Sequence, residues 1–168
     1  MIIKLLLVFI LFCFFVFLIM DEKECFENNF VFRKLNEKDY SDDYFKLLLQ
    51  LTDSKVMNEN EFKNILNEIN KNGNIFVIED KGKIIATAKL LIEHKLIRGG
   101  SKVGHLEDVV VDKNYRQYGL GKKLVNKIVE IARESGCYKI IGNCDNSLIG
   151  FYEKLGFLNK GSQFAIYF

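Results

Sequence analysis

The sequence of 168 residues has no proline and no tryptophan, and its net charge is small. Lysine and arginine total 24 against 22 for aspartate and glutamate, and the basic residues are spread along the chain. So small an excess excludes the concentrated basic surface that is typical of nucleic-acid-binding proteins. Because of this charge pattern we expect no nucleic-acid partner.

The length suits one domain with a hydrophobic core, and no internal repeat marks a second one.

The four cysteines, Cys13, Cys25, Cys137 and Cys144, have neither the C-x-x-C spacing nor the histidine partners of a zinc site. Cys137 and Cys144 flank a predicted strand, and an extended chain of that length holds the two residues too far apart for a disulfide. The sequence therefore predicts free, partly buried thiols and no metal ion.

Residues 1–20 are apolar except for Lys4, and twenty helical residues span about 30 Å, the thickness of a bilayer core. A cleaved signal peptide is the rival interpretation, but Leu18-Ile19-Met20 lacks the small residues of a cleavage site. The pattern favours an uncleaved membrane anchor, followed by a linker over residues 21–29 and a folded domain over residues 30–168. An upstream extension that the working protein does not contain is a third alternative.

Hydrophobic periodicity predicts the order βααβββαβαββ, which is that of an α/β domain. The expected strands are Phe30–Leu35, Asn74–Ile78, Ile84–Ile92, His105–Val111, Tyr138–Cys144, Phe157–Leu158 and Phe164–Phe168. The expected helices are Tyr44–Leu51, Asn58–Ile69, Leu120–Arg133 and Ser147–Leu155. Asn58 with Glu61 resembles a capping box, and Asp80-Lys81-Gly82-Lys83 is a hairpin signal.

The segment Arg116-Gln117-Tyr118-Gly119-Leu120-Gly121-Lys122 lies between a predicted strand and a predicted helix. Gly119 and Gly121 allow the backbone to approach an anion closely, and the first amides of the helix point at that anion. Arg116 and Lys122 add full positive charges. The segment is therefore a candidate pyrophosphate-binding loop, although two glycines at this spacing also occur in ordinary strand-to-helix turns.

Two further absences restrict the anion. No acidic residue stands about twenty positions beyond the loop at a second strand end, as a dinucleotide-binding fold requires. No serine or threonine follows Gly121-Lys122, as a nucleotide P-loop requires. The loop is thus expected to bind neither NAD nor ATP.

Four segments together resemble the GCN5-related N-acetyltransferases (GNAT superfamily): Gly104–Asp112, Arg116–Lys122, Gly136–Ile141 and Gly150–Phe157. The glycine loop and F-Y-E-K-L-G-F are features of the whole superfamily. The segments G-H-L-E-D-V-V-V and G-C-Y-K-I-I are closer to the branch that acetylates glucosamine 6-phosphate. The resemblance implies a mixed, mostly antiparallel central sheet that is flanked by helices and splayed where acetyl-coenzyme A (acetyl-CoA) binds.

This resemblance implies transfer of acetyl from acetyl-CoA to the amine of D-glucosamine 6-phosphate, for UDP-N-acetylglucosamine biosynthesis, by a homodimer without a metal. Two alternatives stay open: acetylation of another amine, such as a protein N-terminus or a polyamine, and a non-catalytic acyl-CoA-binding module. If residues 1–20 anchor the protein in an endomembrane, the family's metabolites place the domain on the cytosolic side. The acidic flank Asp21–Glu24 against Lys4 argues for the opposite side.

The resemblance also implies individual roles. Tyr152 is expected to give a proton to the departing thiolate, because an unperturbed phenol stays protonated to about pH 10, or else only to pack beside Phe151 and Phe157. The expected catalytic residues are Tyr152, Glu107 and Asn143. The expected acetyl-CoA contacts are Val109, Val110, Val111, Arg116, Gln117, Tyr118, Gly119, Leu120, Gly121, Lys122, Tyr152, Glu153 and Lys154. The expected substrate contacts are Thr52, Lys95, Leu96, Ile97, Arg98, Glu107, Asp108, Tyr138, Lys139, Asn143 and Tyr167.

Glu107 and Asp108 are adjacent on a predicted strand, so their side chains point to opposite faces unless a bulge intervenes. The resemblance implies such a bulge. Three positions depart from the family pattern: Asn143 replaces an aspartate, Leu148 an asparagine and Tyr167 an arginine. At position 143 a backbone carbonyl is then expected to accept the amine proton in place of a carboxylate.

Overall fold

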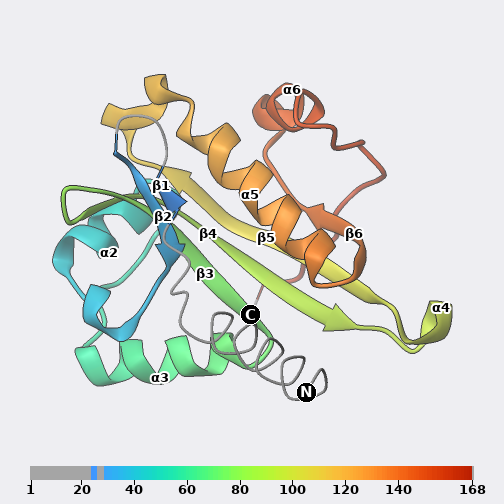
Figure 1. Ribbon diagram of the computed structural model, residues 1–168, viewed down its shortest axis with the longest axis horizontal. Helices are drawn as coiled ribbons and strands as arrows, with labels where there is room; N and C mark the ends of the chain where they lie inside the picture. Colours follow the sequence, from blue (N-terminus) through green and yellow to red (C-terminus); the bar gives the residue numbers. More distant parts are fainter. Residues whose placement is uncertain (1–23, 26–28, 168) are drawn as a thin grey trace, which may run out of the picture.

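The computed structural model describes residues 24–25 and 29–167, which form a sheet with helices packed on it (Figure 1). The strand order is β1-β2-β3-β4-β5-β6, and among these described strands only the β5–β6 pair is parallel. The strands are β1 (Glu24–Cys25), β2 (Val31–Lys34), β3 (Gly73–Asp80), β4 (Lys83–His94), β5 (Lys102–Val111) and β6 (Cys137–Gly142). The predicted mixed, mostly antiparallel sheet is thus confirmed.

Within residues 24–25 and 29–167, five α-helical segments and three 3-10 turns accompany the sheet. The α-helices are α2 (Asp42–Leu48), α3 (Glu59–Asn70), α4 (Ile97–Gly100), α5 (Leu120–Glu134) and α6 (Ile149–Glu153). The 3-10 turns are η1 (Glu37–Asp39), η2 (Lys113–Tyr118) and η3 (Asn146–Leu148). The expected membrane anchor lies outside the described residues. Within the part of the chain that the structure describes, no helix is long and apolar enough to cross a membrane.

Helices α3 and α5 begin where the sequence pattern places them. The Asn58 side chain accepts a hydrogen bond from the Glu61 amide, and the Glu61 carboxylate accepts one from the Asn58 amide. This capping box satisfies two amides that the helix leaves free. One face of α5 is buried against the sheet, at a spacing of three and four residues. It carries Leu120, Leu124, Val125, Ile128 and Ala132.

The sheet separates two hydrophobic clusters. Phe76 and Ile78 of β3 pack in the cluster that includes the buried face of α5. Val77, between them, packs in the cluster formed with α2 and α3. Alternate residues of a strand point to opposite faces, so a single strand serves both cores. The helices therefore fix the sheet from both sides, and Figure 1 shows α5 lying across it.

Strands β5 and β6 are paired only over part of β5. The last pair joins Leu106 to Gly142, and β5 continues to Val111 without a β6 partner. A Cβ at Gly142 would lie 2.9 Å from the Leu106 carbonyl oxygen, so glycine allows the close approach at this last pair. The sheet splays beyond that point and leaves an edge of β5 open, as the family resemblance implies.

The implied bulge is also present on β5. Thr87 pairs with Val110 and Lys89 with Glu107, so one residue of β4 faces two residues of β5. Asp108, one of these two, has a φ of 54°, in the left-handed region. The bulge therefore breaks the strict alternation that would send the side chains of Glu107 and Asp108 to opposite faces.

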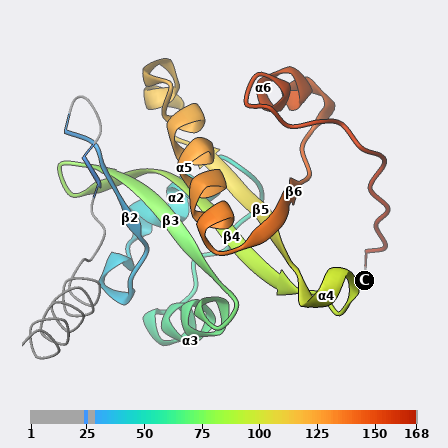
Figure 2. The same ribbon diagram turned by 45° about the vertical axis from the view of Figure 1, so that its right-hand side comes forward.

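The two expected terminal strands, Phe157–Leu158 and Phe164–Phe168, are wrong for the residues that the structure describes. Residues 157–167 form no strand and make an extended arm. Phe164, Ile166 and Tyr167 on the arm are 94%, 82% and 93% exposed. A strand exists only where its amides and carbonyls pair with a neighbour, and the arm runs past β6 without pairing with it (Figure 2). Local β propensity alone was therefore not sufficient to predict strands in this segment.

Candidate active site

The glycine loop joins η2 to α5 and leaves several amides free. Gly119 has a φ of 67°, and a Cβ there would meet nothing within 4 Å, so this position favours glycine because of its backbone conformation. No side chain caps α5, and Lys123 N to Gly119 O, at 3.2 Å, is the hydrogen bond that starts the helix. The amides of Leu120, Gly121 and Lys122 therefore point out of the helix end, which suits an anion.

Other side chains of the loop hold its shape. The Asp112 carboxylate accepts a hydrogen bond from the Asn114 amide at 2.9 Å and so caps η2. Arg116 Nε donates to the Val111 carbonyl oxygen at 3.3 Å, and Gln117 Nε2 donates to the Asn114 carbonyl oxygen at 2.8 Å. These contacts keep η2 and its cation close to the end of β5.

Helix α6 lies beside the beginning of α5. A Cβ at Gly121 would be 3.5 Å from Phe151 of α6 and 3.6 Å from Val111 of β5. The three expected acetyl-CoA segments, Val109–Val111, Arg116–Lys122 and the α6 residues Tyr152 to Lys154, therefore meet around this point. Tyr152 of α6 is half-buried, whereas Glu153 and the following residue Lys154 are exposed.

Tyr152 packs edge-on against two aromatic rings, at 5.0 Å from Phe151 and 5.5 Å from Phe157. Burial, and to a lesser degree the nearby Cys144, raises the pKa of the Tyr152 hydroxyl. The phenol is therefore protonated at neutral pH and able to donate a proton. Asn143 is exposed directly after the end of β6. The Asn143 side chain is an exposed amide, so it does not replace the carboxylate of the aspartate that the family pattern has at this position.

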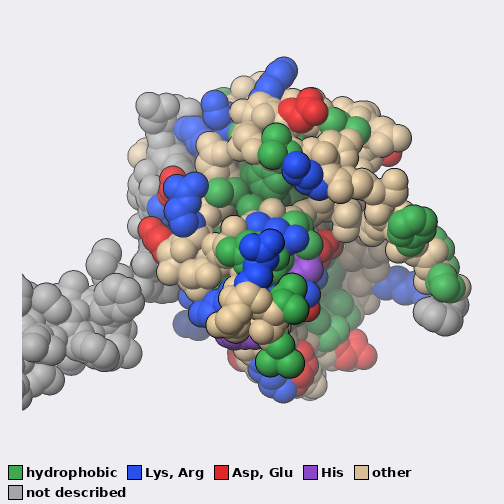
Figure 3. All heavy atoms as spheres, turned by 90° about the vertical axis from the view of Figure 1, so that its right-hand side faces the viewer, with side chains coloured by type: hydrophobic (Ala, Val, Ile, Leu, Met, Phe, Trp, Pro, Cys, Tyr) green, Lys and Arg blue, Asp and Glu red, His purple; other side chains and the backbone are tan. Residues whose placement is uncertain are grey.

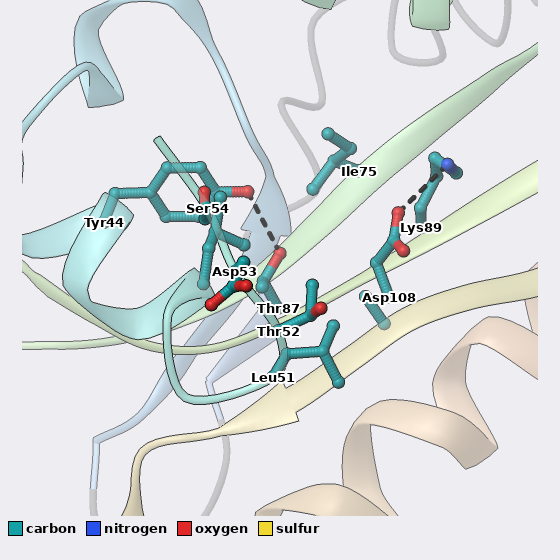
Figure 4. Close-up of a pocket in the computed structure, with 11 residues that line it drawn as sticks. Tyr44, Leu51, Thr52, Asp53, Ser54, Ile75, Thr87, Lys89 and Asp108 are labelled. Carbon is teal, nitrogen blue, oxygen red and sulfur yellow. Dashed lines mark hydrogen bonds and ion pairs between the residues drawn. The ribbon is translucent and has the colours of Figure 1, made fainter. Parts of the chain in front are cut away.

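A cavity of about 190 Å³ opens between the end of α2 and strands β4 and β5 (Figure 4). Thr52 and Asp108, both expected substrate contacts, line it. The Asp108 carboxylate pairs with the Lys89 ammonium at 3.0 Å. Glu107, half-buried, lies opposite Lys89 in the strand register. The structure therefore brings Thr52, Asp108 and Glu107 to the same region of the sheet.

Five polar residues that line this cavity were missed by the sequence reasoning: Tyr44, Asp53, Ser54, Thr87 and Lys89. Tyr44 is buried, and its hydroxyl lies 3.4 Å from Thr87 Oγ1. Burial raises the pKa of Tyr44 to about 12, so the phenol is neutral. Lys89 was also missed, although the alternation of β4 places it on the face opposite Ala88 and Leu90. That alternation is the signal that could have found it.

A second group of expected substrate contacts lies where the β4–β5 connection meets β6. The Arg98 guanidinium lies 4.8 Å from the centre of the Tyr138 ring, and the Lys139 ammonium lies 5.6 Å from it. Lys95 pairs with Glu93, whose other oxygen contacts His105 Nε2 at 2.9 Å. Hydrogen bonds from Lys95 and then His105 lower the pKa of Glu93. Figure 3 shows lysine and arginine side chains gathered at this end of the molecule.

Four expected substrate contacts take no part in either group: Leu96, Ile97, Asn143 and Tyr167. Leu96 and Ile97, at the tip of the β4–β5 connection, are 100% and 64% exposed. Tyr167 is on the exposed arm. None of these residues lines the cavity. Among the described residues, no group of three or more histidine, cysteine or acidic side chains is placed to hold a metal ion, and Cys137 and Cys144 are free.

The segments that carry this geometry match a known family. Residues 32–157 match the model of the acetyltransferase (GNAT) family, which covers most of the described domain. The chain belongs to the GNAT family. The similarity includes β5 with its bulge, the glycine loop, β6 and α6, so the family resemblance seen in the sequence is confirmed.

Several relatives of this GNAT protein are similar over most of their length. A probable glucosamine 6-phosphate N-acetyltransferase of Oryza sativa subsp. japonica is 43% identical over 143 residues, which cover 81% of this chain and 86% of that protein. The crystal structure of glucosamine 6-phosphate N-acetyltransferase from Arabidopsis thaliana has 40% identity and a TM-score of 0.79, over 83% of this chain and 98% of that one. An acetyltransferase structure from Trypanosoma brucei has 38% identity and a TM-score of 0.79, over 83% and 99%.

Proposed function

We propose that this GNAT protein transfers the acetyl group of acetyl-CoA to the amine of D-glucosamine 6-phosphate, giving N-acetylglucosamine 6-phosphate for UDP-N-acetylglucosamine synthesis. The observation that carries the proposal is the pair of cations Arg98 and Lys139 at the Tyr138 ring, with a third cation, Lys95, paired with Glu93 in the same β4–β5 connection as Arg98. Arginine and lysine bind phosphate by charge and, for arginine, by a planar fork of donors. The names of the rice and Arabidopsis relatives support the same substrate.

The described residues fit the diphosphate and pantetheine parts of acetyl-CoA. The free amides of Leu120 to Lys122 and the positive end of α5 suit a pyrophosphate, and Arg116 adds charge. The unpaired edge of β5 at Val109–Val111 offers backbone groups to the amides of pantetheine. When bound, acetyl-CoA supplies a thioester whose carbonyl carbon accepts the amine.

The chain's own residues then orient the sugar and supply one proton. The amine nitrogen forms a bond to the acyl carbon, and the carbon–sulfur bond breaks. The Asn143 backbone carbonyl oxygen is assigned a hydrogen bond from the amine, and the Tyr152 hydroxyl gives its proton to the departing thiolate. The proton that the amine loses as the amide forms passes to solvent, and Tyr152 regains a proton from solvent, so that the phenol is restored. Glu107 and Asp108 are assigned to the sugar hydroxyls and amine, with Asp108 held by Lys89. The half-buried phenol supports this role because it is neutral at working pH.

A homodimer is part of the proposal. Strand β6 ends the sheet, so among the described residues its outer edge has no strand partner. The arm presents Phe164, Ile166 and Tyr167 to solvent, and Leu96 and Ile97 are also exposed, in the β4–β5 connection. Open strand edges and exposed apolar side chains are features that a second copy covers. Such a copy would also supply a neighbour for Tyr167, an expected substrate contact that is isolated in one chain.

The decisive experiment is a coenzyme A release assay with a panel of amines: glucosamine 6-phosphate, glucosamine, a polyamine and a peptide N-terminus. We expect turnover with the phosphosugar and at most weak turnover with the others. Preference for the polyamine or the peptide would identify that amine as the substrate in place of glucosamine 6-phosphate. Binding of acetyl-CoA without turnover of any amine would favour the non-catalytic binding module.

A further inference from the structure

Gln50 connects the two halves of the candidate active site. It is half-buried in the turn that follows α2. Its side-chain oxygen Oε1 accepts a hydrogen bond from the Lys113 amide at 2.8 Å, across 63 positions of sequence. Gln50 is also the last of the groups that lower the pKa of the Asp112 carboxyl, after the Asn114 amide and Lys83. One amide side chain therefore ties the turn after α2 to the first residue of η2.

The sugar side of this connection is the segment that follows Gln50. Leu51, Thr52, Asp53 and Ser54 line the cavity next to Asp108 (Figure 4). Leu49, Leu51 and Val56 are between 43% and 57% exposed, so burial holds the segment only weakly. At its far end the Tyr40 hydroxyl donates to the Met57 carbonyl oxygen at 2.9 Å. Backbone hydrogen bonds from Leu51 and Thr52 to the Leu48 carbonyl oxygen hold the near end on α2. The Gln50 side chain, two residues before Thr52, ties this end to η2.

The cofactor side of the connection is η2 itself. Lys113 is the first residue of η2, and Gly119 at its end is the N-cap of α5. Arg116 and Gln117 lie within this turn, and both belong to the expected acetyl-CoA loop. Any ligand that orders η2 therefore also fixes the amide to which Gln50 is bonded. A second ligand that needs an ordered Thr52 segment then loses less conformational freedom on binding.

We propose that Gln50 is a positioning residue that couples sugar binding to coenzyme A binding by holding the Thr52 segment against η2. The inference rests on the proposed function, since it assumes that the cavity takes the amino sugar. It assigns Gln50 no contact with either substrate. By linkage, the coupling is reciprocal: each ligand tightens the binding of the other by the same factor.

Three variants of the full chain test this coupling. Gln50→Met keeps the length of the side chain and removes its hydrogen bonds. Lys113→Pro removes the donor amide itself, and proline is suited to the first position of a helical turn. The preceding residue, Asp112, has φ −49° and ψ 129°, a conformation that a following proline accepts. Lys113→Ala is the matched control, because it keeps the amide and removes only the side chain.

The measurement is isothermal titration of coenzyme A with and without glucosamine 6-phosphate, and of the sugar phosphate with and without coenzyme A. In the wild type we expect each ligand to tighten the other. In Gln50→Met and Lys113→Pro this factor should fall about threefold to tenfold, as for the loss of one hydrogen bond. KM for the sugar should rise while kcat changes little. Lys113→Ala should match the wild type.

Wild-type coupling in both Gln50→Met and Lys113→Pro would overturn the inference, as would independent binding of the two ligands in the wild type. Melting temperatures distinguish this coupling role from a merely structural one. If Gln50 only stabilises the fold, its substitution would lower the melting temperature without changing the coupling. Failure of the proposed function gives a different result. In that case the wild type itself would not acetylate glucosamine 6-phosphate.

Discussion

Asp108 Oδ2 lies 3.0 Å from Lys89 Nζ, and the carboxylate reaches this ammonium from a residue whose φ is 54°. A left-handed non-glycine residue costs roughly 1–2 kcal/mol, less for aspartate. The bulge therefore holds a strained residue in the wall of the cavity. Strain of this kind persists where the surrounding structure fixes it and is common at active sites.

Replacing Asp108 by glycine should separate stability from function. Glycine adopts this φ without strain, so Asp108→Gly should be as stable as the wild type to within about 1 kcal/mol. Its kcat/KM for glucosamine 6-phosphate should nevertheless fall at least tenfold, because Lys89 loses its partner in the cavity. Urea denaturation and steady-state kinetics measure the two effects. A variant that keeps wild-type kcat/KM would show that the Asp108 carboxylate only supports the bulge.

Tyr152→Phe tests the proton donor. The ring keeps its contacts with Phe151 and Phe157, so stability should change little. Loss of general acid catalysis should lower kcat roughly 10²- to 10⁴-fold. Coenzyme A affinity should change much less, since the glycine loop is untouched. Wild-type kcat with an unaltered pH profile would leave solvent as the donor.

Lys139→Ala tests the phosphate cations. Lys139 lies beside Tyr138 with Arg98, and its loss should raise KM for glucosamine 6-phosphate about tenfold, as expected for one charged hydrogen bond. The Kd of coenzyme A should stay nearly constant, and the weak activity on unphosphorylated glucosamine should not fall. Lys71→Ala is the control, because it removes an exposed lysine that pairs with Glu68 away from the site. An unchanged KM would assign Lys139 to the surface.

Asp112→Asn should make stability depend less on acid pH. The Asn114 amide, and then Lys83 and Gln50, lower the pKa of the Asp112 carboxyl in the folded protein. Its stabilising effect is therefore complete above the ordinary carboxyl pKa and is lost as the pH falls through the lowered value. The asparagine oxygen still accepts the hydrogen bond of the Asn114 amide, so the cap is kept. We therefore expect the variant to be less stable at pH 7 by at most about 1 kcal/mol, from the lost charge opposite Lys83. Denaturation from pH 7 to pH 2 should show the difference vanishing at low pH.

The arm tests the homodimer. Replacing Phe164 and Ile166 by serine removes two side chains that a single chain leaves 94% and 82% exposed. The variant should be monomeric in analytical ultracentrifugation, whereas the wild type should sediment as a dimer. The fold of each subunit should persist, because these residues lie outside both hydrophobic clusters. A monomeric wild type would contradict the proposal directly.

Local sequence signals predicted a large part of this fold. The capping pair Asn58 and Glu61 marks the start of α3, and Gly119 marks that of α5, because caps and left-handed turns depend on neighbouring residues alone. The apolar spacing of α5 and the alternation of β3 and β4 identified the elements that form the core. The family segments between Gly104 and Phe157 determined the class of reaction.

The tertiary structure decided what depends on residues far apart in the chain. The cavity joins Tyr44 to Thr87 and Asp108, and the tie between Gln50 and Lys113 spans 63 positions, so no local pattern contains either. The segment Phe164–Phe168 has strand-like residues, but a strand also needs a neighbouring edge. Propensity and capping are local energies that the sequence alone determined, whereas strand pairing, cavities and contacts between loops exist only once the chain has folded.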